Sequence, residues 1–325
     1  MRVITLEEHF RNPLVSDMGE HYYRRFDQGR GPIADQLAEI GEERIADMDK
    51  NGIDLQVLSH TVPSPEIVEP ARAIPLCARV NDELAATVGR YPARFGAFAS
   101  LPVADPSAAA KELERAVTQL HFQGAMIQGV AQGRFLDDPF FYSLLERAES
   151  LGTPIYLHPA PPPEPVMNTY FAGLEPSVAT MLSIAGWGWH AETALHTLRL
   201  IAAGTFDRFP KLQLIIGHMG EMIPFQLARI DQALGRVTAN LRQPPSAYFQ
   251  TNIWITTSGL FTAPPLYLAL QVLGADRILF AIDYPYSSNQ TGRQFLDRLA
   301  LNSADLEKIT HRNAERLLRL PATPR

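Results

Sequence analysis

The sequence predicts a (β/α)8 barrel, or TIM barrel, an α/β fold that residues 1–325 build as a single domain. Short apolar, β-branched runs alternate with longer helical patterns along the whole chain, which is typical of βαβ units and a parallel sheet. About eight such runs occur, and this number favours a barrel over an open doubly wound sheet. No shift in composition divides the chain, so we expect one domain.

The expected strands begin with the opening run of residues 3–6. The runs that follow are residues 55–59, 96–101, 124–129, 154–157, 212–217, 253–257 and 278–282. Helical patterns lie between them, for instance over residues 78–90 and 192–203. In such a barrel the active site is built where the strands end.

One long irregular segment, residues 160–188, interrupts this alternation. It opens with a proline-rich stretch and ends beside the aromatic pair Trp187 and Trp189. A loop of this length in a compact domain usually covers or binds something, so we expect a lid or substrate loop.

Composition excludes several classes of function. The net charge is −6, and no cluster of Lys and Arg with interleaved aromatic residues occurs, so no nucleic-acid partner is expected. The apolar runs are shorter than the roughly 20 residues of a membrane span, so no membrane partner is expected either. The single cysteine, Cys77, cannot form an internal disulfide, which fits a reducing compartment. We therefore expect a cytoplasmic protein.

Residues of the types that bind metal ions, glutamate, aspartate and histidine, follow several of the expected strands. Glu7 and His9 end the first run and, two residues apart on a strand, point to the same side. His158 and Asp283 close two later runs. Two imidazoles and two carboxylates suit Zn²⁺ or Mn²⁺. A solvated acid or a capping histidine would explain each residue alone, but hardly all four together.

His218 and Glu221 follow another buried strand, in the sequence Gly-His-Met-Gly-Glu. Glu221 is expected to open the next helix, where the helix N-terminus favours a carboxylate that can tune a neighbouring imidazole. General acid/base catalysis is one interpretation. A capping glutamate and a structural histidine are the other, and spacing alone does not separate them.

Further side chains near strand ends are candidates for substrate binding. His60 and His190 are weaker candidates: for His60, substrate contact and an exposed loop position are comparable interpretations, and His190 adjoins Trp189 just before an expected helix. Aromatic residues could wall an aromatic substrate or belong to the core, and an arginine could bind a substrate carboxylate. The substrate-binding candidates are Phe10, Tyr23, His60, Trp187, Trp189, Arg229 and Tyr284.

Several motifs together resemble the amidohydrolase-related non-oxidative decarboxylases, close to γ-resorcylate and 2,3-dihydroxybenzoate decarboxylases. The resemblance spans nearly the whole chain. It rests on Leu6-Glu7-Glu8-His9-Phe10, Asn81-Asp82-Glu83-Leu84, Arg94-Phe95-Gly96-Ala97-Phe98-Ala99, Tyr156-Leu157-His158-Pro159, Glu192-Thr193-Ala194, Gly217-His218-Met219-Gly220-Glu221, Thr256-Thr257-Ser258-Gly259 and Gly274-Ala275-Asp276-Arg277-Ile278-Leu279-Phe280.

The resemblance implies one catalytic divalent metal held by the residues matching Glu7, His9, His158 and Asp283. It also implies that Asp283, protonated in the working complex, gives its proton to the carboxyl-bearing ring carbon of a small aromatic acid, and that His218 with Glu221 form the relay supplying it.

Two alternatives remain. The superfamily's hydrolases often begin with His-x-His, whereas this chain has Glu-x-His, which lowers the expectation of a metal-dependent hydrolase of a lactone, ester or amide. A metal-holding subunit without catalysis is the third interpretation. The resemblance further implies a homodimer or homotetramer.

Overall fold

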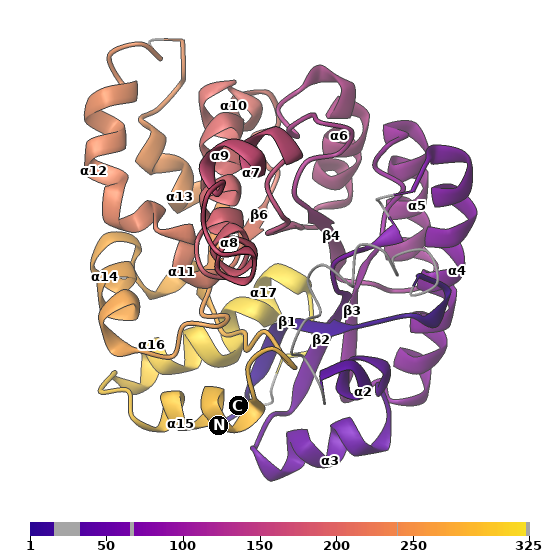
Figure 1. The fold of residues 1–325 in the computed structure, drawn as a ribbon. Coiled ribbons are helices and arrows are strands. Elements are labelled where there is room, and N and C mark those ends of the chain that lie inside the picture. The colour runs from indigo at the N-terminus through magenta and orange to yellow at the C-terminus, as the bar shows by residue number, and fades with distance from the viewer. Residues whose placement is uncertain (16–32, 66–67, 239, 323–325) are drawn as a thin grey trace.

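A computed structural model gives the fold; it describes residues 1–15, 33–65, 68–238 and 240–322. One sheet of eight parallel strands follows the chain order from β1 to β8, with helices around it (Figure 1). The strands are β1 (Ile4–Phe10), β2 (Leu55–His60), β3 (Phe95–Ala99), β4 (Gly124–Gln128), β5 (Ile155–His158), β6 (Leu214–Ile216), β7 (Ile253–Thr256) and β8 (Ile278–Leu279). The predicted (β/α)8 barrel is confirmed, and each expected run contains or overlaps one strand.

The helices occupy the connections between strands. The longer ones are α3 (Glu42–Lys50), α4 (Pro70–Arg90), α5 (Pro106–Thr118), α6 (Tyr142–Leu151), α9 (Gly188–Ala202), α12 (Ile223–Leu234), α14 (Ala263–Leu273) and α15 (Asn289–Asp297). Shorter ones are α2 (Ile33–Ala38), α7 (Glu164–Tyr170), α8 (Pro176–Ser183), α10 (Thr205–Arg208), α11 (His218–Glu221), α13 (Tyr248–Thr251), α16 (Ser303–Glu307), α17 (Asn313–Leu318) and the 3₁₀ turn η3 (Pro245–Ala247). The two expected helices are confirmed within α4 and α9. None of the described helices is long and apolar enough to cross a membrane.

The sheet closes on itself through the backbone. A parallel bridge pairs Glu8 of β1 with Tyr284, just past β8, and the His9 amide donates to the Tyr284 carbonyl oxygen at 2.6 Å. The Glu8 carboxylate adds a second connection, because it accepts from the amides of Ile282 (2.9 Å) and Tyr284 (3.3 Å). These contacts hold both neighbours of Asp283 against the first strand.

Apolar side chains pack on both faces of the sheet. The interior cluster includes Ile4, Leu6 and Tyr156, whereas the larger cluster lies between strands and helices. Strict alternation after Leu6 would turn Glu7 outward, but the register of β1 shifts between Thr5 and Glu8. This irregularity re-aims the end of the strand, as bulges commonly do near active sites, and brings Glu7 and His9 into the barrel mouth.

The segment 160–188 is not the irregular loop that we expected. It contains α7 and α8, and α8 packs against α9. Glu175 caps α8 by accepting from the amides of Ser177 and Val178, at 3.0 and 3.2 Å. The proline-rich opening hid these short helices, because proline is tolerated in a first helical turn. Its role as a lid stays a prediction.

Candidate metal centre and active site

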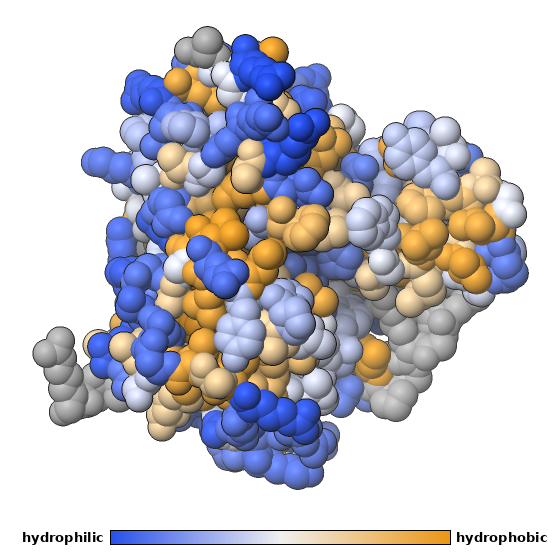
Figure 2. All heavy atoms as spheres, turned by 90° about the vertical axis from the view of Figure 1, so that its left-hand side faces the viewer, coloured by the Kyte–Doolittle hydropathy of each residue, from blue (hydrophilic) through white to orange (hydrophobic). Residues whose placement is uncertain are grey.

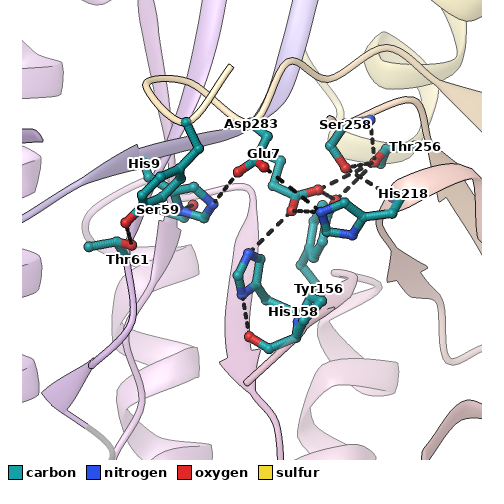
Figure 3. A network of polar contacts seen from close by, with 12 residues as sticks. Glu7, His9, Ser59, Thr61, Tyr156, His158, His218, Thr256, Ser258 and Asp283 are labelled. Atoms are coloured by element: carbon teal, nitrogen blue, oxygen red, sulfur yellow. Dashed lines mark hydrogen bonds and ion pairs between the residues drawn. The ribbon is translucent and has the colours of Figure 1, made fainter. Parts of the chain in front are cut away.

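Four donor side chains meet at the carboxyl ends of the strands. Glu7 and His9 come from β1, His158 ends β5, and Asp283 follows β8 (Figure 3). Donor atoms of all four lie within 4.8 Å of one another. Glu7 Oε1 is 3.2 Å from His158 Nε2, and His9 Nε2 is 3.2 Å from Asp283 Oδ1. The structure thus brings together the four residues whose convergence the sequence predicted, and they could hold one metal ion.

The unsatisfied polarity of this cluster fits a cation. Glu7 Oε1 and His9 Nε2 are buried, and neither has a partner of good hydrogen-bond geometry among the described residues. His158 Nδ1 donates to the Pro159 carbonyl oxygen at 2.7 Å, which turns Nε2 toward Glu7 Oε1. A divalent ion between that nitrogen and the carboxylate oxygen would be bound by both atoms.

Glu7 is held from behind by hydroxyl groups. Tyr156, Thr256 and Ser258 form a chain of hydroxyls in which Tyr156 donates to Glu7 Oε2 and lies 3.0 Å from Thr256 Oγ1 (Figure 3). Burial alone would raise the pKa of Glu7, but His218, His158 and His9 outweigh it and hold that pKa well below its ordinary value. Glu7 is therefore an ionised carboxylate with a fixed orientation.

Asp283 is also ionised in this state. Burial raises the pKa of Asp283, but the neighbouring His218 and His9 imidazoles lower it by more, and the net shift is downward. An ionised Asp283 suits a ligand role. The protonated Asp283 that the family resemblance implies would therefore have to form in the substrate complex, where a second carboxylate adds negative charge.

His218 and Glu221 lie beside the four donors. His218 Nε2 is 3.6 Å from Glu7 Oε1 and 3.9 Å from Asp283 Oδ2, and its Nδ1 is 2.7 Å from Glu221 Oε1. Burial lowers the pKa of His218, but Glu221 and Glu7 outweigh it and raise that pKa well above its ordinary value. His218 is thus a protonated group directed at Asp283.

The turn that carries this pair is left-handed, which the sequence did not predict. His218, Met219, Gly220, Glu221 and Met222 all have positive φ, between 48° and 79°. Left-handed helical backbone costs about 1–2 kcal/mol for each non-glycine residue, so tertiary contacts must hold it. Helix α12 starts only at Ile223, and Glu221 does not cap it. The expected helix-opening role of Glu221 is therefore wrong. The imidazoles of His218 and His190, not the helix N-terminus, stabilise its negative charge.

Three of the expected substrate-binding residues are buried packing residues. Phe10 places its ring against His60, with centroids 5.2 Å apart. His60 uses both ring nitrogens on the backbone: Nε2 accepts from the Asn12 amide at 3.0 Å, and Nδ1 lies 2.7 Å from the Thr61 carbonyl oxygen. The Tyr284 ring lies under the Arg44 guanidinium at 4.6 Å. These contacts favour structural roles for all three.

The remaining candidates divide by location. Trp187 lines an apolar groove of about 920 Å³ between α9, α12 and α14, which ends at His218 and Glu221; Figure 2 shows apolar residues gathered on this side of the molecule. Trp189 is half-buried beside His190. Arg229 is exposed on α12, where it donates to Gln232, so the structure does not place it with the cluster. Tyr23 lies outside the described residues.

Two neighbours of the site were missed from sequence. Tyr156 looked like an ordinary strand residue, although its position two before His158 predicts the same face. Tyr286 lies edge-on to His9, with ring centroids 5.6 Å apart, and its hydroxyl is 2.6 Å from Thr61 Oγ1. The only sequence signal for Tyr286 was its position three residues after Asp283.

Comparison with known proteins places the chain in a family. The model of the amidohydrolase family matches residues 16–320, so the chain belongs to that family. Among curated relatives, the decarboxylase orsB of Emericella nidulans is 39% identical over 98% of this chain and 97% of its own length. The γ-resorcylate decarboxylase of Polaromonas sp. is 34% identical over 98% of each chain.

Solved structures agree. A 2,6-dihydroxybenzoate decarboxylase in complex with 2,6-dihydroxybenzoate matches with a TM-score of 0.88 and 34% identity, covering 98% of this chain and 100% of that one. A dihydroxybenzoic acid decarboxylase from Polaromonas sp., with bound manganese and the inhibitor 2-nitroresorcinol, matches with a TM-score of 0.89 and 32% identity over 99% and 98% of the two chains. The fold is thus shared with dihydroxybenzoate decarboxylases, one of which holds manganese.

Proposed function

We propose that this protein is a metal-dependent, non-oxidative decarboxylase of a hydroxybenzoate-type acid, such as γ-resorcylate (2,6-dihydroxybenzoate) or 2,3-dihydroxybenzoate, which releases the phenol and CO₂. One observation carries the proposal: a cluster of two carboxylates and two imidazoles lies directly beside a charged histidine–glutamate pair. The named activities of the relatives and the aromatic ligands of the solved structures support it.

In this proposal Glu7, His9, His158 and Asp283 hold one divalent ion, Mn²⁺ or Zn²⁺. The donor set of nitrogen and oxygen suits either ion. Such an ion supplies positive charge that fixes the substrate carboxylate and its ortho hydroxyl and favours negative charge on oxygen. Tyr156 and Thr256 keep Glu7 oriented toward the ion.

The protein supplies the proton. His218 Nε2, 3.9 Å from Asp283 Oδ2, passes a proton to that carboxylate, and Asp283 delivers it to the ring carbon that bears the carboxyl group. The bond from that carbon to the carboxylate then breaks, CO₂ leaves, and the bonding electron pair returns to the ring, which becomes aromatic again. One proton is consumed in each turnover and no oxidant is needed. Proton transfer of this kind typically contributes about 10²–10⁴-fold to a rate.

Turnover of a small panel of acids tests the proposal. The manganese-loaded protein should release CO₂ from 2,6- or 2,3-dihydroxybenzoate but not from benzoate, which lacks the ortho hydroxyl. Asp283→Asn should abolish release, whereas Asp276→Asn, at an exposed ion pair with Lys308, should leave it unchanged. Hydrolysis of esters or lactones without CO₂ release would instead favour the hydrolase alternative. A metal-loaded protein inactive on all these compounds would favour a non-catalytic role.

Two finer expectations accompany the proposal. The family resemblance implies a homodimer or homotetramer, which light scattering of the purified protein would test. The cytoplasmic location, expected from the single cysteine, also stays a prediction; fractionation of the source cells would test it.

A further inference from the structure

Glu221 joins two histidines, not one. Its Oε1 is 2.7 Å from His218 Nδ1, and its Oε2 is 2.7 Å from His190 Nδ1. The three side chains form a second cluster of titratable groups beside the four donors, and the two imidazole rings lie edge-on with centroids 4.5 Å apart. His218 and Glu221 are buried, whereas the His190 side chain is 19% exposed. The cluster therefore extends from the barrel mouth to solvent, and His190 is its outer end.

The outer nitrogen of His190 has two partners that require different protonation states. Because Nδ1 donates to the Glu221 carboxylate, the neutral ring carries a lone pair on Nε2, and this accepts from the Trp189 indole N–H at 3.1 Å. When the ring is charged, Nε2 also carries a proton and can donate to the Ala185 carbonyl oxygen, likewise at 3.1 Å. Two N–H donors cannot share one bond, so the indole must then leave Nε2.

Few other titratable groups of the described elements lie near His190. Among the described elements that pack most closely against α9, α11 contributes His218 and Glu221, whereas α8 and η3 carry no titratable side chain. Asp207 and Arg208 of α10 follow the opposite end of α9. Glu192 lies two residues after His190 in α9 itself, and burial raises the pKa of Glu192. Glu221 is thus the dominant electrostatic partner of His190.

We propose that His190 is a positioning residue that fixes Glu221 and conducts protons between solvent and the His218–Glu221 pair, and that Trp189 reports which protonation state it holds. This inference rests on the proposed decarboxylase function, because that reaction consumes one proton in each turnover and a buried relay has to be recharged.

The proton transfers balance along this path. A proton from solvent binds His190 Nε2, and the proton on His190 Nδ1 passes to Glu221 Oε2. That proton replaces the one that the charged His218 passes from Nε2 to Asp283 Oδ2, so the His218–Glu221 pair keeps its number of protons. One proton has entered at the surface and one has reached the acid that protonates the ring carbon.

Two substitutions at His190 separate positioning from conduction. His190→Asn keeps a donor near the Nδ1 position but cannot carry a proton across a ring, whereas His190→Ala removes both functions. Both should lower kcat by about 10²-fold or more, in line with the usual contribution of proton transfer, with KM within about twofold of wild type. Imidazole and related amines should restore the Ala variant, with rates that depend on the amine pKa. His121→Asn, at the amino ends of the strands, serves as control.

Metal content and melting temperature of each variant exclude trivial losses. If manganese binding and folding are intact and His190→Asn turns over at the wild-type rate, proton conduction through His190 is refuted. If only KM changes in both variants, the residue acts on substrate binding and the inference fails. If wild-type protein releases no CO₂ from any acid, the proposed function fails instead.

An independent measurement requires neither substrate nor catalytic turnover. The chain has three tryptophans, so ¹⁵N-labelled indole groups give three signals, and Trp189→Phe identifies the relevant one. In wild type this signal should shift with pH, because a charged His190 ring cannot accept from the indole N–H, and in His190→Asn it should not. A Trp189 signal that is independent of pH in the wild type would overturn the inference.

Discussion

Tyr156→Phe tests whether Glu7 owes its metal-binding orientation to the hydroxyl groups behind it. The Tyr156 hydroxyl is buried and donates to Glu7 Oε2, and the only other donor to this oxygen among the described side chains is the weaker Thr256 hydroxyl at 3.4 Å. The substitution removes the hydroxyl and leaves the ring packed against Phe98.

The expected cost follows from the charge of the acceptor. A hydrogen bond to a charged group is worth about 1.5–3 kcal/mol, and loss of a partner behind a metal ligand typically costs about 10–100-fold in metal affinity. We therefore expect manganese to bind about 10–100-fold more weakly, measured by isothermal titration calorimetry on protein stripped of metal. Turnover should be regained at high manganese concentration, because the acid relay is untouched.

Tyr248→Phe is the matched control. It also removes a tyrosine hydroxyl bonded to a carboxylate, Asp207 Oδ1 at 2.6 Å, but at the far end of α9. Both variants should lose stability, and only Tyr156→Phe should lose metal affinity. Equal manganese affinity in Tyr156→Phe and wild type would refute the reasoning that this hydroxyl orients Glu7.

Three further predictions concern the metal and pH. Chelation should abolish CO₂ release and lower the melting temperature, and added Mn²⁺ should restore both. A ligand at about 100 times its Kd stabilises the folded state by about 2.7 kcal/mol. Activity that survives complete metal removal would contradict the ligand assignment. Gly217→Ala should weaken manganese binding in calorimetry, because the new Cβ would lie 2.8 Å from Glu7 Oε2; unchanged affinity would show that Glu7 can move without cost. Burial lowers the pKa of His196 to about 3, so the unfolded state binds a proton first as pH falls below 6.5, and stability is lost from there down to about pH 3. His196→Gln should therefore lose less stability between pH 7 and 4.5 in urea titrations than wild type; an equal loss would mean that other groups carry it.

The fold was readable from the sequence because a parallel barrel repeats one local pattern. Buried strands on both faces are continuous apolar runs, and each run ends in the side chains that line the mouth. Glu7, His9, His158 and Asp283 could be grouped for this reason alone. That Glu7 and His9 face the same side followed from the alternation of a strand, but the irregularity of β1 that turns Glu7 into the barrel mouth was not predictable from this pattern.

The relay and the lid segment were harder to predict, for different physical reasons. Glu221 appeared to begin a helix, but its turn has left-handed backbone that tertiary contacts impose on ordinary residues. His190 of α9 and Glu221 of α11 are separated in the chain by α10 and β6 and come together only in the folded protein, so no local sequence pattern indicates their contact. The helices of residues 160–188 are short and begin at prolines, so they lack the periodicity that identifies longer helices.

The origin of the four donors along the chain has a consequence for biosynthesis. Two of them leave the ribosome among the first residues, one comes from the middle of the chain, and Asp283 follows the last strand. A complete coordination sphere therefore exists only after the final strand has docked beside the first. Loading of the ion is then a late step of maturation, and a polypeptide cut short before residue 283 has no full site to load.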